Sequence, residues 1–597
     1  MRIDIFIKRI VLIIRSLLYK LSSKDILLVL SLVVGILCGL ASVVLKLSID
    51  WMHNCVDSWF PGEEFNVLYL VYPGVGMLIA MLFVRYVVKD NIGHGVTKVL
   101  QSISKNDSKI KPHNMWTSLL SSSVTIGFGG SVGAEAPIVY TGAAIGSNVA
   151  KFMGLPYRDM TILLGCGAAG AVAGIFKAPL AGVLFTLEIL LFNISMSSIL
   201  PLLLASVSST VISYLFLGRT LPFESNLEPF AMNNIVFYII LGITCAGLSV
   251  YFTRTTLWLE DKIKTIKNIY KRWAFSSLGL GLLIFLFPPL YGEGYSYLTT
   301  LLNGGEISFE GETILSFFMS SPWTVPVFFF LILLLKVFSM SFTNAGGGVG
   351  GTFGPTLFIG GITGFVVARL INLILVTSGL AVPEQNFVLV GMAGLMAGVM
   401  QAPMTAIFLI AEISGGYELL LPLILTSSIS FGLTRAFEPY SIYTKRIAKK
   451  GELLTHDSDK TVLTLLKTSD LIESNFSSIK IDSTLRELVE VIANSNRNLF
   501  PVIDSKNHFQ GFVSLEDVRK DMFKTQEYDT LYVYNFMKSA PAYVQVDERM
   551  EDVMRKFENT NAWNLPVVDK DRKYVGFVSK SKIFSVYRAQ LKQVSHD

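Results

Sequence analysis

Long apolar segments occupy most of the chain up to about residue 450, and only short polar connections separate them. The segments 26–46 and 67–88 are each long enough to cross a bilayer. Between 116 and 214 glycines and prolines break the apolar sequence into pieces, several of which are too short to be simple spans. Broken helices at membrane depth are tolerated only where protein buries them or where they line a cavity. The pattern predicts a many-span helical membrane unit with discontinuous helices.

From about residue 468 the pattern changes to charged, alternating sequence typical of a soluble domain. The segment 498–518 recurs as 564–583, so that Pro501 and Gly511 reappear 65 residues later. Each copy combines a helix pattern, a short apolar strand, a turn that contains Asp and a second strand, which predicts two tandem α+β modules. The predicted boundaries are 451–467 for a linker, 468–530 for the first module and 531–597 for the second.

Composition agrees with an integral membrane protein, since 51% of the residues are hydrophobic and the mean hydropathy is +0.53. A net charge of +5 is small for this length and gives no indication of nucleic-acid binding. The four cysteines have neither metal nor disulfide spacing, which favours core packing. Residues 1–23 predict an interfacial amphipathic helix. Basic runs here and at 262–272 and 444–450 predict a cytoplasmic N-terminus and tail, in a plasma or inner membrane.

A lone carboxylate, Glu135, lies in a glycine-rich turn at 127–146 inside strongly apolar sequence. Pro137 suits the first turn of a helix, where a backbone donor would have no intrahelical partner. The free amides at such a helix start favour an anion, and a carboxylate can occupy the same place. Glu135 is therefore a candidate tethered plug, and the simpler alternative is a carboxylate that only caps a helix.

The turn recurs at 345–364 with an offset of 218, and Phe353 stands in place of Glu135. A second matching pair follows at an offset of 224, which aligns Glu188 with Glu412. Two copies of a membrane unit with broken helices match the internal repeats that build a midplane site from half-helix ends. The predicted membrane unit is 24–450, with repeats at about 24–217 and 232–450.

These motifs resemble the CLC family of chloride channels and proton-coupled chloride transporters, and the tail resembles a pair of CBS domains. GAEAP at 133–137 resembles the family's gating motif GxEGP apart from Ala136, and GTFGP at 351–355 has its GxFxP pattern. The resemblance implies an all-α polytopic inverted repeat with an α+β tandem CBS tail. It also implies a homodimer in membrane lipid, with a separate pathway for chloride or a similar small anion in each subunit.

The resemblance assigns Glu135 as the external gate and proton carrier. It places an anion on backbone amides at helix starts and on a pore tyrosine, which maps to Tyr443 with Tyr440 as the alternative. Amides and a hydroxyl replace hydration without a fixed full charge that would trap the anion. The candidate anion-binding residues are His94, Gly95, Ala134, Ala136, Thr352, Phe353 and Tyr443.

Two positions depart from the family pattern. His94, in GHGVT at 93–97, replaces a pore serine, so its ring either donates to the anion or turns aside and bonds to backbone. Ile189 stands where many family exchangers have an inner proton-relay glutamate, and Glu188 is expected to be a structural helix-end carboxylate. Proton-coupled exchange and a passive voltage- or pH-gated channel both stay open, with exchange preferred.

In the tail, Ser514 and Asp517 match the ribose-binding pattern of CBS domains, whereas Lys582 replaces the acid in the second copy. One adenine-nucleotide site and pure dimer scaffolding are the two interpretations, and we expect no required cofactor and no metal. The glycine-rich turns lack the Lys and Ser/Thr of a P-loop, and no catalytic set is recognisable, so an enzyme is not expected. A CBS-linked cation channel or a membrane-anchored nucleotide sensor are the rival classes.

Overall fold

The structure, a computed structural model, describes residues 22–59, 67–105, 107–190, 196–223, 227–305, 321–375, 381–449, 466 and 468–586. The interfacial helix predicted at 1–23 and the linker predicted at 451–467 lie almost wholly outside these residues. The chain forms two compact units, Met1–Leu453 and Leu454–Asp597.

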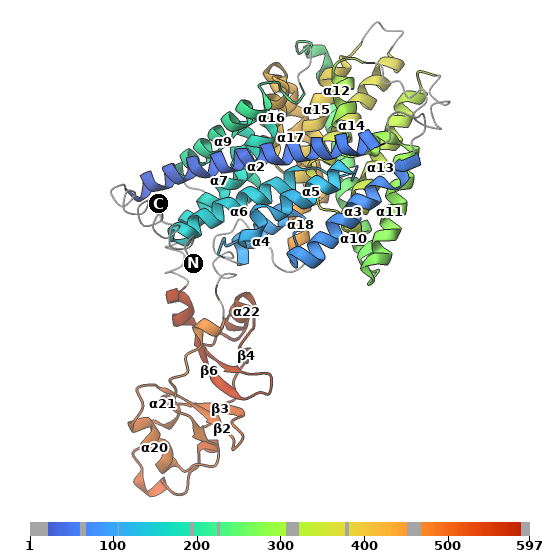
Figure 1. Ribbon diagram of the computed structural model, residues 1–597. Coiled ribbons are helices and arrows are strands. Elements are labelled where there is room, and N and C mark those ends of the chain that lie inside the picture. The colour runs from blue at the N-terminus through green and yellow to red at the C-terminus, as the bar shows by residue number, and fades with distance from the viewer. Residues whose placement is uncertain are drawn as a thin grey trace. The chain divides into compact units, whose positions relative to one another are not determined.

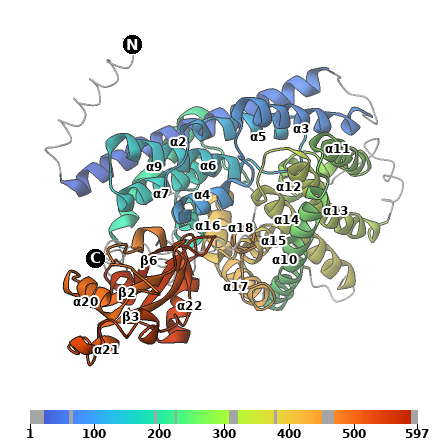
Figure 2. The same ribbon diagram turned by 90° about the horizontal axis from the view of Figure 1, so that it is seen from below.

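The first unit consists of helices (Figures 1 and 2). Within its described residues, nine helices are long and apolar enough to cross a membrane. Several others are short or interrupted, as the glycine and proline pattern predicts. The helices of the first half are α2 (Ser23–Trp59), η1 (Val67–Leu70), α3 (Tyr72–Leu82), η2 (Phe83–Val88), α4 (Gly95–Lys105), η3 (Pro112–Met115), α5 (Thr117–Gly127), α6 (Glu135–Met153), α7 (Tyr157–Phe176), α8 (Pro179–Phe185), η4 (Thr186–Leu190) and α9 (Met196–Leu217).

The second half repeats the packing of the first. Helices α2, α7 and α9 pack on one another, as α10, α15 and α17 do, and α6 packs on α7 as α14 packs on α15. The helices of this half are η5 (Met232–Asn234), α10 (Ile235–Lys264), α11 (Ile269–Leu286), η6 (Pro288–Leu290), α12 (Tyr295–Leu302), α13 (Thr324–Gly346), α14 (Phe353–Ile374), α15 (Glu384–Met400), α16 (Pro403–Ser414), η9 (Tyr417–Leu419), α17 (Leu420–Phe437) and α18 (Ile442–Ala448).

A carboxylate from each repeat also caps a helix of the other repeat. Glu188 accepts hydrogen bonds from the backbone N–H of Met404 at 3.0 Å and of Thr405 at 2.7 Å, at the start of α16. Glu412 accepts bonds from Leu180 and Ala181 at 3.0 and 2.8 Å, at the start of α8. Each carboxylate satisfies amides that have no intrahelical partner. The expectation that Glu188 is a structural helix-end carboxylate is confirmed, and the helix that it caps belongs to the other repeat.

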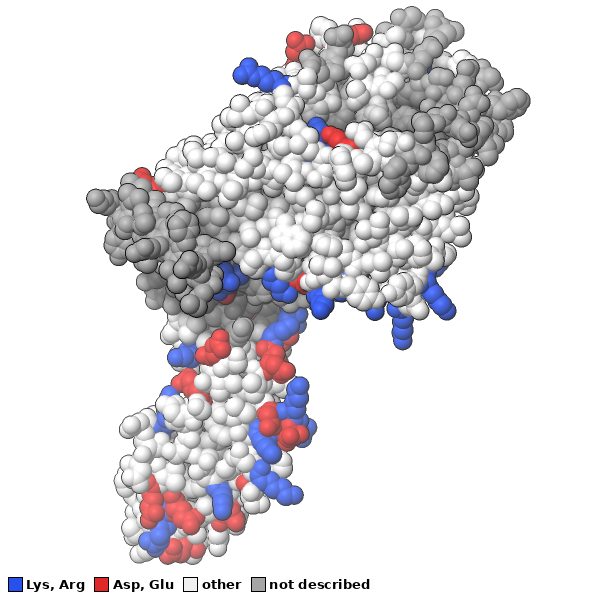
Figure 3. Space-filling model, viewed as in Figure 1, with Lys and Arg blue, Asp and Glu red and all other residues white. Residues whose placement is uncertain are grey.

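Charge is distributed differently in the two units. The visible face of the membrane unit is largely uncharged, with Lys and Arg gathered along one edge, whereas the second unit carries both signs over its surface (Figure 3). An uncharged band with a basic margin is typical of a membrane-embedded surface.

The second unit contains two similar α+β modules. In each, a short strand pairs in parallel with a central strand, and the central strand pairs antiparallel with a third. A capping box of Thr484 and Glu487 starts α20, whose Leu488 packs on the buried Val502 and Val513 of the sheet. The elements are η10 (Thr468–Leu471), β1 (Ile479–Lys480), α20 (Leu485–Ala493), β2 (Leu499–Ile503), β3 (Phe509–Ser514), α21 (Leu515–Val518), η11 (Thr525–Glu527), η12 (Val533–Asn535), β4 (Val544–Gln545), α22 (Met550–Thr560), β5 (Asn564–Val568) and β6 (Tyr574–Ser579).

Candidate functional site

The two glycine-rich turns meet in the structure and bring two helix N-termini together. Backbone bonds join Gly133 and Gly351 in both directions, at 3.1 and 2.7 Å, so α6 and α14 start side by side. Glu135, the first residue of α6, is 3% exposed. Its Oε2 accepts a hydrogen bond from the N–H of Gly354 at 3.2 Å. The carboxylate of one repeat therefore occupies the N-terminus of the matching helix in the other.

Gly133 provides the space for this carboxylate. A Cβ on Gly133 would lie 2.0 Å from Oε2 of Glu135 and 2.8 Å from the nitrogen of Gly354. Both distances are too short for real contacts, so a larger residue would displace whatever group binds the Gly354 amide. The glycine of the sequence motif is thus required by the close approach of a ligand to the backbone.

A second donor holds the other oxygen of the carboxylate. The hydroxyl of Tyr295, at the start of α12, donates to Oε1 of Glu135 at 2.5 Å. The Tyr295 ring packs edge-on against Phe223 at a centroid distance of 5.3 Å, which fixes its direction. Hydrogen bonds to a charged acceptor contribute about 1.5–3 kcal/mol each. The two donors together select one position for the Glu135 side chain.

Two charged residues beside this site were missed by the sequence analysis. Oε1 of Glu293 accepts a hydrogen bond from the N–H of Ala134 at 2.9 Å. Lys336, in α13, is completely buried and donates to the carbonyl oxygens of Leu290 and Gly292, at 3.4 and 2.8 Å. In this structure the Ala134 amide thus donates to a carboxylate of the protein, and its role as an anion ligand stays a prediction.

A sequence signal for both residues existed. Glu293 lies between Gly292 and Gly294, so it is an acid in a glycine-containing turn as Glu135 is, and Lys336 is a lone cation in an apolar helix. Ionisable groups in such surroundings are rare and usually functional.

Ala136 and Gly95 meet where α4 approaches α6. A Cβ on Gly95 would lie 2.2 Å from the carbonyl oxygen of Ala136, and one on Gly351 would lie 2.8 Å from the Ala136 methyl group. Both candidates therefore lie at the junction of the helix starts, where the close contacts leave no room for a side chain at position 95.

His94 precedes α4 with a φ of 57°, and its ring faces a carboxylate. Its Nε2 lies 3.3 Å from Oε2 of Glu260, whose other oxygen accepts from Arg446 at 2.8 Å. The sequence did not predict this partner, since the ring is paired with Glu260 of α10 through Nε2. A role of His94 in anion binding stays a prediction. This cluster ties the start of α4 to α10 and α18.

Thr352, Phe353 and Tyr443 lie together at the start of α14. The hydroxyl of Tyr443 is next to that of Thr352. Both residues are buried, and apart from this mutual contact neither hydroxyl has a hydrogen-bond partner among the described residues. The Phe353 ring packs on the Phe176 ring at a centroid distance of 5.4 Å, and the Phe353 backbone forms the first residue of α14. Buried donors without partners are costly, so this place suits a bound polar ligand.

Tyr440, the alternative pore tyrosine, is 42% exposed, whereas Tyr443 is 2% exposed. A residue that replaces the hydration shell of an ion inside the protein has to be buried. Burial therefore favours Tyr443 of the two candidates.

In the second unit, Ser514 and Asp517 bond to each other. The Ser514 hydroxyl donates to Asp517 at 2.7 Å, and Lys538 forms an ion pair with the same carboxylate. Burial opposes ionisation of Asp517, but these bonds outweigh it and lower its pKa. In the second module the matching Ser579 donates to Glu473 at 2.7 Å. A ribose at Ser514 and Asp517 would have to replace existing contacts.

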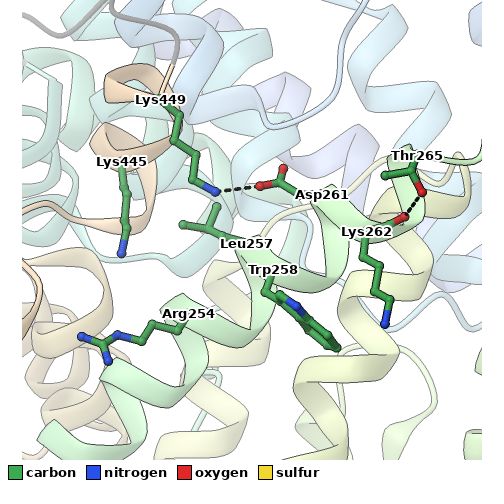
Figure 4. Close-up of a pocket in the computed structure, with 8 residues that line it drawn as sticks. All are labelled: Arg254, Leu257, Trp258, Asp261, Lys262, Thr265, Lys445 and Lys449. Atoms are coloured by element: carbon green, nitrogen blue, oxygen red, sulfur yellow. Dashed lines mark hydrogen bonds and ion pairs between the residues drawn. The ribbon is translucent and has the colours of Figure 1, made fainter.

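A separate surface hollow of about 560 Å³ lies along the end of α10 and beside α18 (Figure 4). The amino group of Lys262 lies 4.9 Å from the Trp258 ring, and Lys449 pairs with Asp261 at 2.7 Å. None of the candidate gate or anion residues lines this hollow. Exposed tryptophan with basic neighbours is typical of the membrane–water interface.

Comparisons with known proteins agree with this arrangement. A family model described as voltage gated chloride channel matches residues 75–435, and a CBS domain model matches 469–524 and 533–589. The H(+)/Cl(−) exchange transporter ClcA of Vibrio cholerae is 26% identical over 459 residues, which cover 72% of this chain and 91% of that protein. The chloride channel protein CLC-f of Arabidopsis thaliana is 24% identical over 486 residues, which cover 72% of this chain and 60% of that protein.

Solved structures share the fold. A slow cyanobacterial Cl−/H+ antiporter superposes with a TM-score of 0.62 at 21% identity, over 72% of this chain and 98% of the antiporter. A eukaryotic CLC transporter superposes with a TM-score of 0.60 at 18% identity, over 94% of this chain and 99% of the transporter.

Proposed function

Because the chain belongs to the voltage-gated chloride channel family, we propose that it carries chloride or a similar small anion across a membrane in exchange for protons. The observation that carries the proposal is the position of Glu135, whose carboxylate accepts from the Gly354 amide at 3.2 Å. A helix N-terminus that binds a tethered carboxylate also suits a free anion. The gate and the anion then compete for the same donors.

Protonation decides this competition. An ionised Glu135 accepts strong bonds from Gly354 and Tyr295, whereas a neutral carboxyl group accepts weaker ones. An anion that displaces the Glu135 side chain can accept a hydrogen bond from the Gly354 amide in its place. The buried hydroxyls of Thr352 and Tyr443 offer further donors. Since no full positive charge has to hold the anion there, it can also leave. A released Glu135 side chain can carry a proton.

The alternative is a passive anion channel, and one observation favours it. Position 189 is a buried isoleucine, while the neighbouring Glu188 is engaged in capping α16. Proton exchange therefore requires a route that does not use a carboxylate at position 189. Relatives called exchange transporters and relatives called channels both match this chain.

We propose a homodimer with one pathway per subunit, and a cytoplasmic N-terminus and CBS pair. The basic residues at the ends of α10 and α18 support this orientation. We propose an adenine nucleotide as the ligand of the CBS pair, with Ser514 and Asp517 releasing each other and Lys538 to bind it.

The test uses purified protein in liposomes under a chloride gradient, with chloride and proton fluxes recorded together. Uphill proton movement that disappears in Glu135→Gln is expected for an exchanger. Glu384→Gln is the matched control, because this acid of α15 pairs with Arg369 and lies outside the gate. Chloride flux without proton movement would establish the channel, and no anion flux in either protein would contradict the proposal.

A further inference from the structure

Two carboxylates, not one, occupy the helix N-termini at the gate. Glu135 accepts from Gly354 at the start of α14, and Glu293 accepts from Ala134 at the start of α6. Tyr295, two residues after Glu293, donates to Glu135. Since backbone bonds join the turns before α6 and α14, both carboxylates lie at one junction.

The charged groups around Glu293 come from several elements. Glu135 belongs to α6, Lys336 to α13 and Lys46 to α2, and all three interact electrostatically with Glu293. Lys336 is fully buried but bonds to the carbonyls of Leu290 and Gly292, and its amino group lies 4.8 Å from the Phe358 ring. It therefore holds the turn before Glu293 through these carbonyl groups, and its charge attracts the Glu293 carboxylate.

We propose that Glu293 is a second gating carboxylate, which holds the Ala134 amide against anions as Glu135 holds the Gly354 amide. The inference rests on the proposed anion transport. An anion bound between the two helix starts adds a negative charge beside both acids. Because like charges within a few ångströms disfavour ionisation, each acid is then expected to take up a proton when the anion binds.

Proton uptake that accompanies anion binding makes the dissociation constant for chloride depend on pH. Each proton taken up with the anion makes the dissociation constant for chloride rise about tenfold per pH unit, wherever the free protein holds both acids ionised. With two gating acids the rise approaches about 100-fold per pH unit. If Glu293 only positions the turn, the rise stays at or below about tenfold.

The experiment is isothermal titration calorimetry of chloride into the purified full-length protein, across a pH series and in buffers of different ionisation enthalpy. The buffer comparison counts the protons taken up by the wild-type protein, so the result does not depend on any variant folding. More than one proton per chloride is expected at pH values where the free protein holds both acids ionised. Glu293→Gln, which retains an acceptor for the Ala134 amide, is expected to lower the number by up to one, as is Glu135→Gln.

Glu412→Gln is the matched control, because this acid also accepts helix N-terminal amides but at α8. It is expected to leave the proton count unchanged. A wild-type uptake of one proton or fewer, unaltered in Glu293→Gln, overturns the inference and leaves anion transport intact. An absence of chloride binding at every pH, in the wild-type protein and in Glu135→Gln, overturns the proposed function and the inference with it.

Discussion

The hydroxyl of Tyr295 is the group whose removal isolates the energy that holds the gate in place. Tyr295→Phe deletes the bond of 2.5 Å to Glu135 but retains the ring that packs on Phe223. A hydrogen bond to a charged acceptor contributes about 1.5–3 kcal/mol. Because about 1.4 kcal/mol corresponds to a factor of ten, the ratio of displaced to bound gate is expected to rise about 10- to 150-fold.

The assay is chloride binding by calorimetry together with chloride efflux from liposomes, both at neutral pH. The apparent dissociation constant is expected to fall by the same factor, since the anion competes with a weaker plug. Tyr251→Phe is the control, because its hydroxyl donates to the Leu334 carbonyl at 3.0 Å and bonds to neither Glu135 nor Glu293. It is expected to leave both measurements unchanged.

A second background decides whether the hydroxyl acts on the gate or on the anion. In Glu135→Ala the carboxylate that accepts from Tyr295 is absent, so adding Tyr295→Phe is expected to leave chloride affinity as it is. If the double variant binds chloride several-fold more weakly than Glu135→Ala alone, Tyr295 donates to the anion itself. That result would refute the reasoning given for the gate.

Three further predictions concern Gly133, Tyr443 and an ion pair of the tail. Gly133→Ala leaves no room for a ligand at the Gly354 amide. Chloride flux is therefore expected to fall about tenfold or more, even when Glu135 is already replaced by Ala. A double variant with the same flux as Glu135→Ala alone would contradict this geometry. Tyr443→Phe removes a buried hydroxyl that has no partner beyond Thr352 among the described residues. Chloride affinity is expected to fall about tenfold while the melting temperature is unchanged. An unaltered affinity in calorimetry would exclude the Tyr443 hydroxyl as a ligand of the anion. In the tail, burial opposes ionisation of Glu473, but bonds from Ser579 and Arg497 outweigh it and lower its pKa below the usual 4.5. The stability that ionised Glu473 adds to the folded tail is fully present above pH 4.5 and is lost as the pH falls through the lowered pKa. Arg497→Met is therefore expected to destabilise the tail by about 1 kcal/mol at pH 7 and less at pH 3 in scanning calorimetry; an equal loss at both pH values would mean that packing, not charge, is responsible.

The comparison of sequence and structure is clearest at the repeats. The offset of 218 between the two turns is also the offset between the starts of α6 and α14, and Lys177 and Gln401, 224 residues apart, both end their helices with positive φ. Glycine, proline and apolar periodicity act locally, because they restrict the backbone conformations and the burial of each segment. The sequence could therefore predict the helix starts, the broken spans and the tandem α+β tail.

The partners of the site residues could not be predicted in the same way. His94 pairs with Glu260, Ala134 donates to Glu293, and Tyr295 reaches Glu135, in each case across 150 residues or more. Such contacts depend on how the two repeats pack, and no local pattern encodes that packing. Burial likewise selected Tyr443 over Tyr440 only once α18 was in place.

The sequence by itself determined the membrane architecture, the internal repeat and Glu135 as a lone acid at a helix start, because short-range periodicity and backbone preference set these features. Only the tertiary structure decided that this carboxylate lies on the opposite repeat's helix, that Glu293 accepts from the neighbouring amide, and that the helix capped by Glu188 belongs to the other repeat. Hydrogen bonds and charges act through space, over a few ångströms, and the fold alone brings these distant positions within that range.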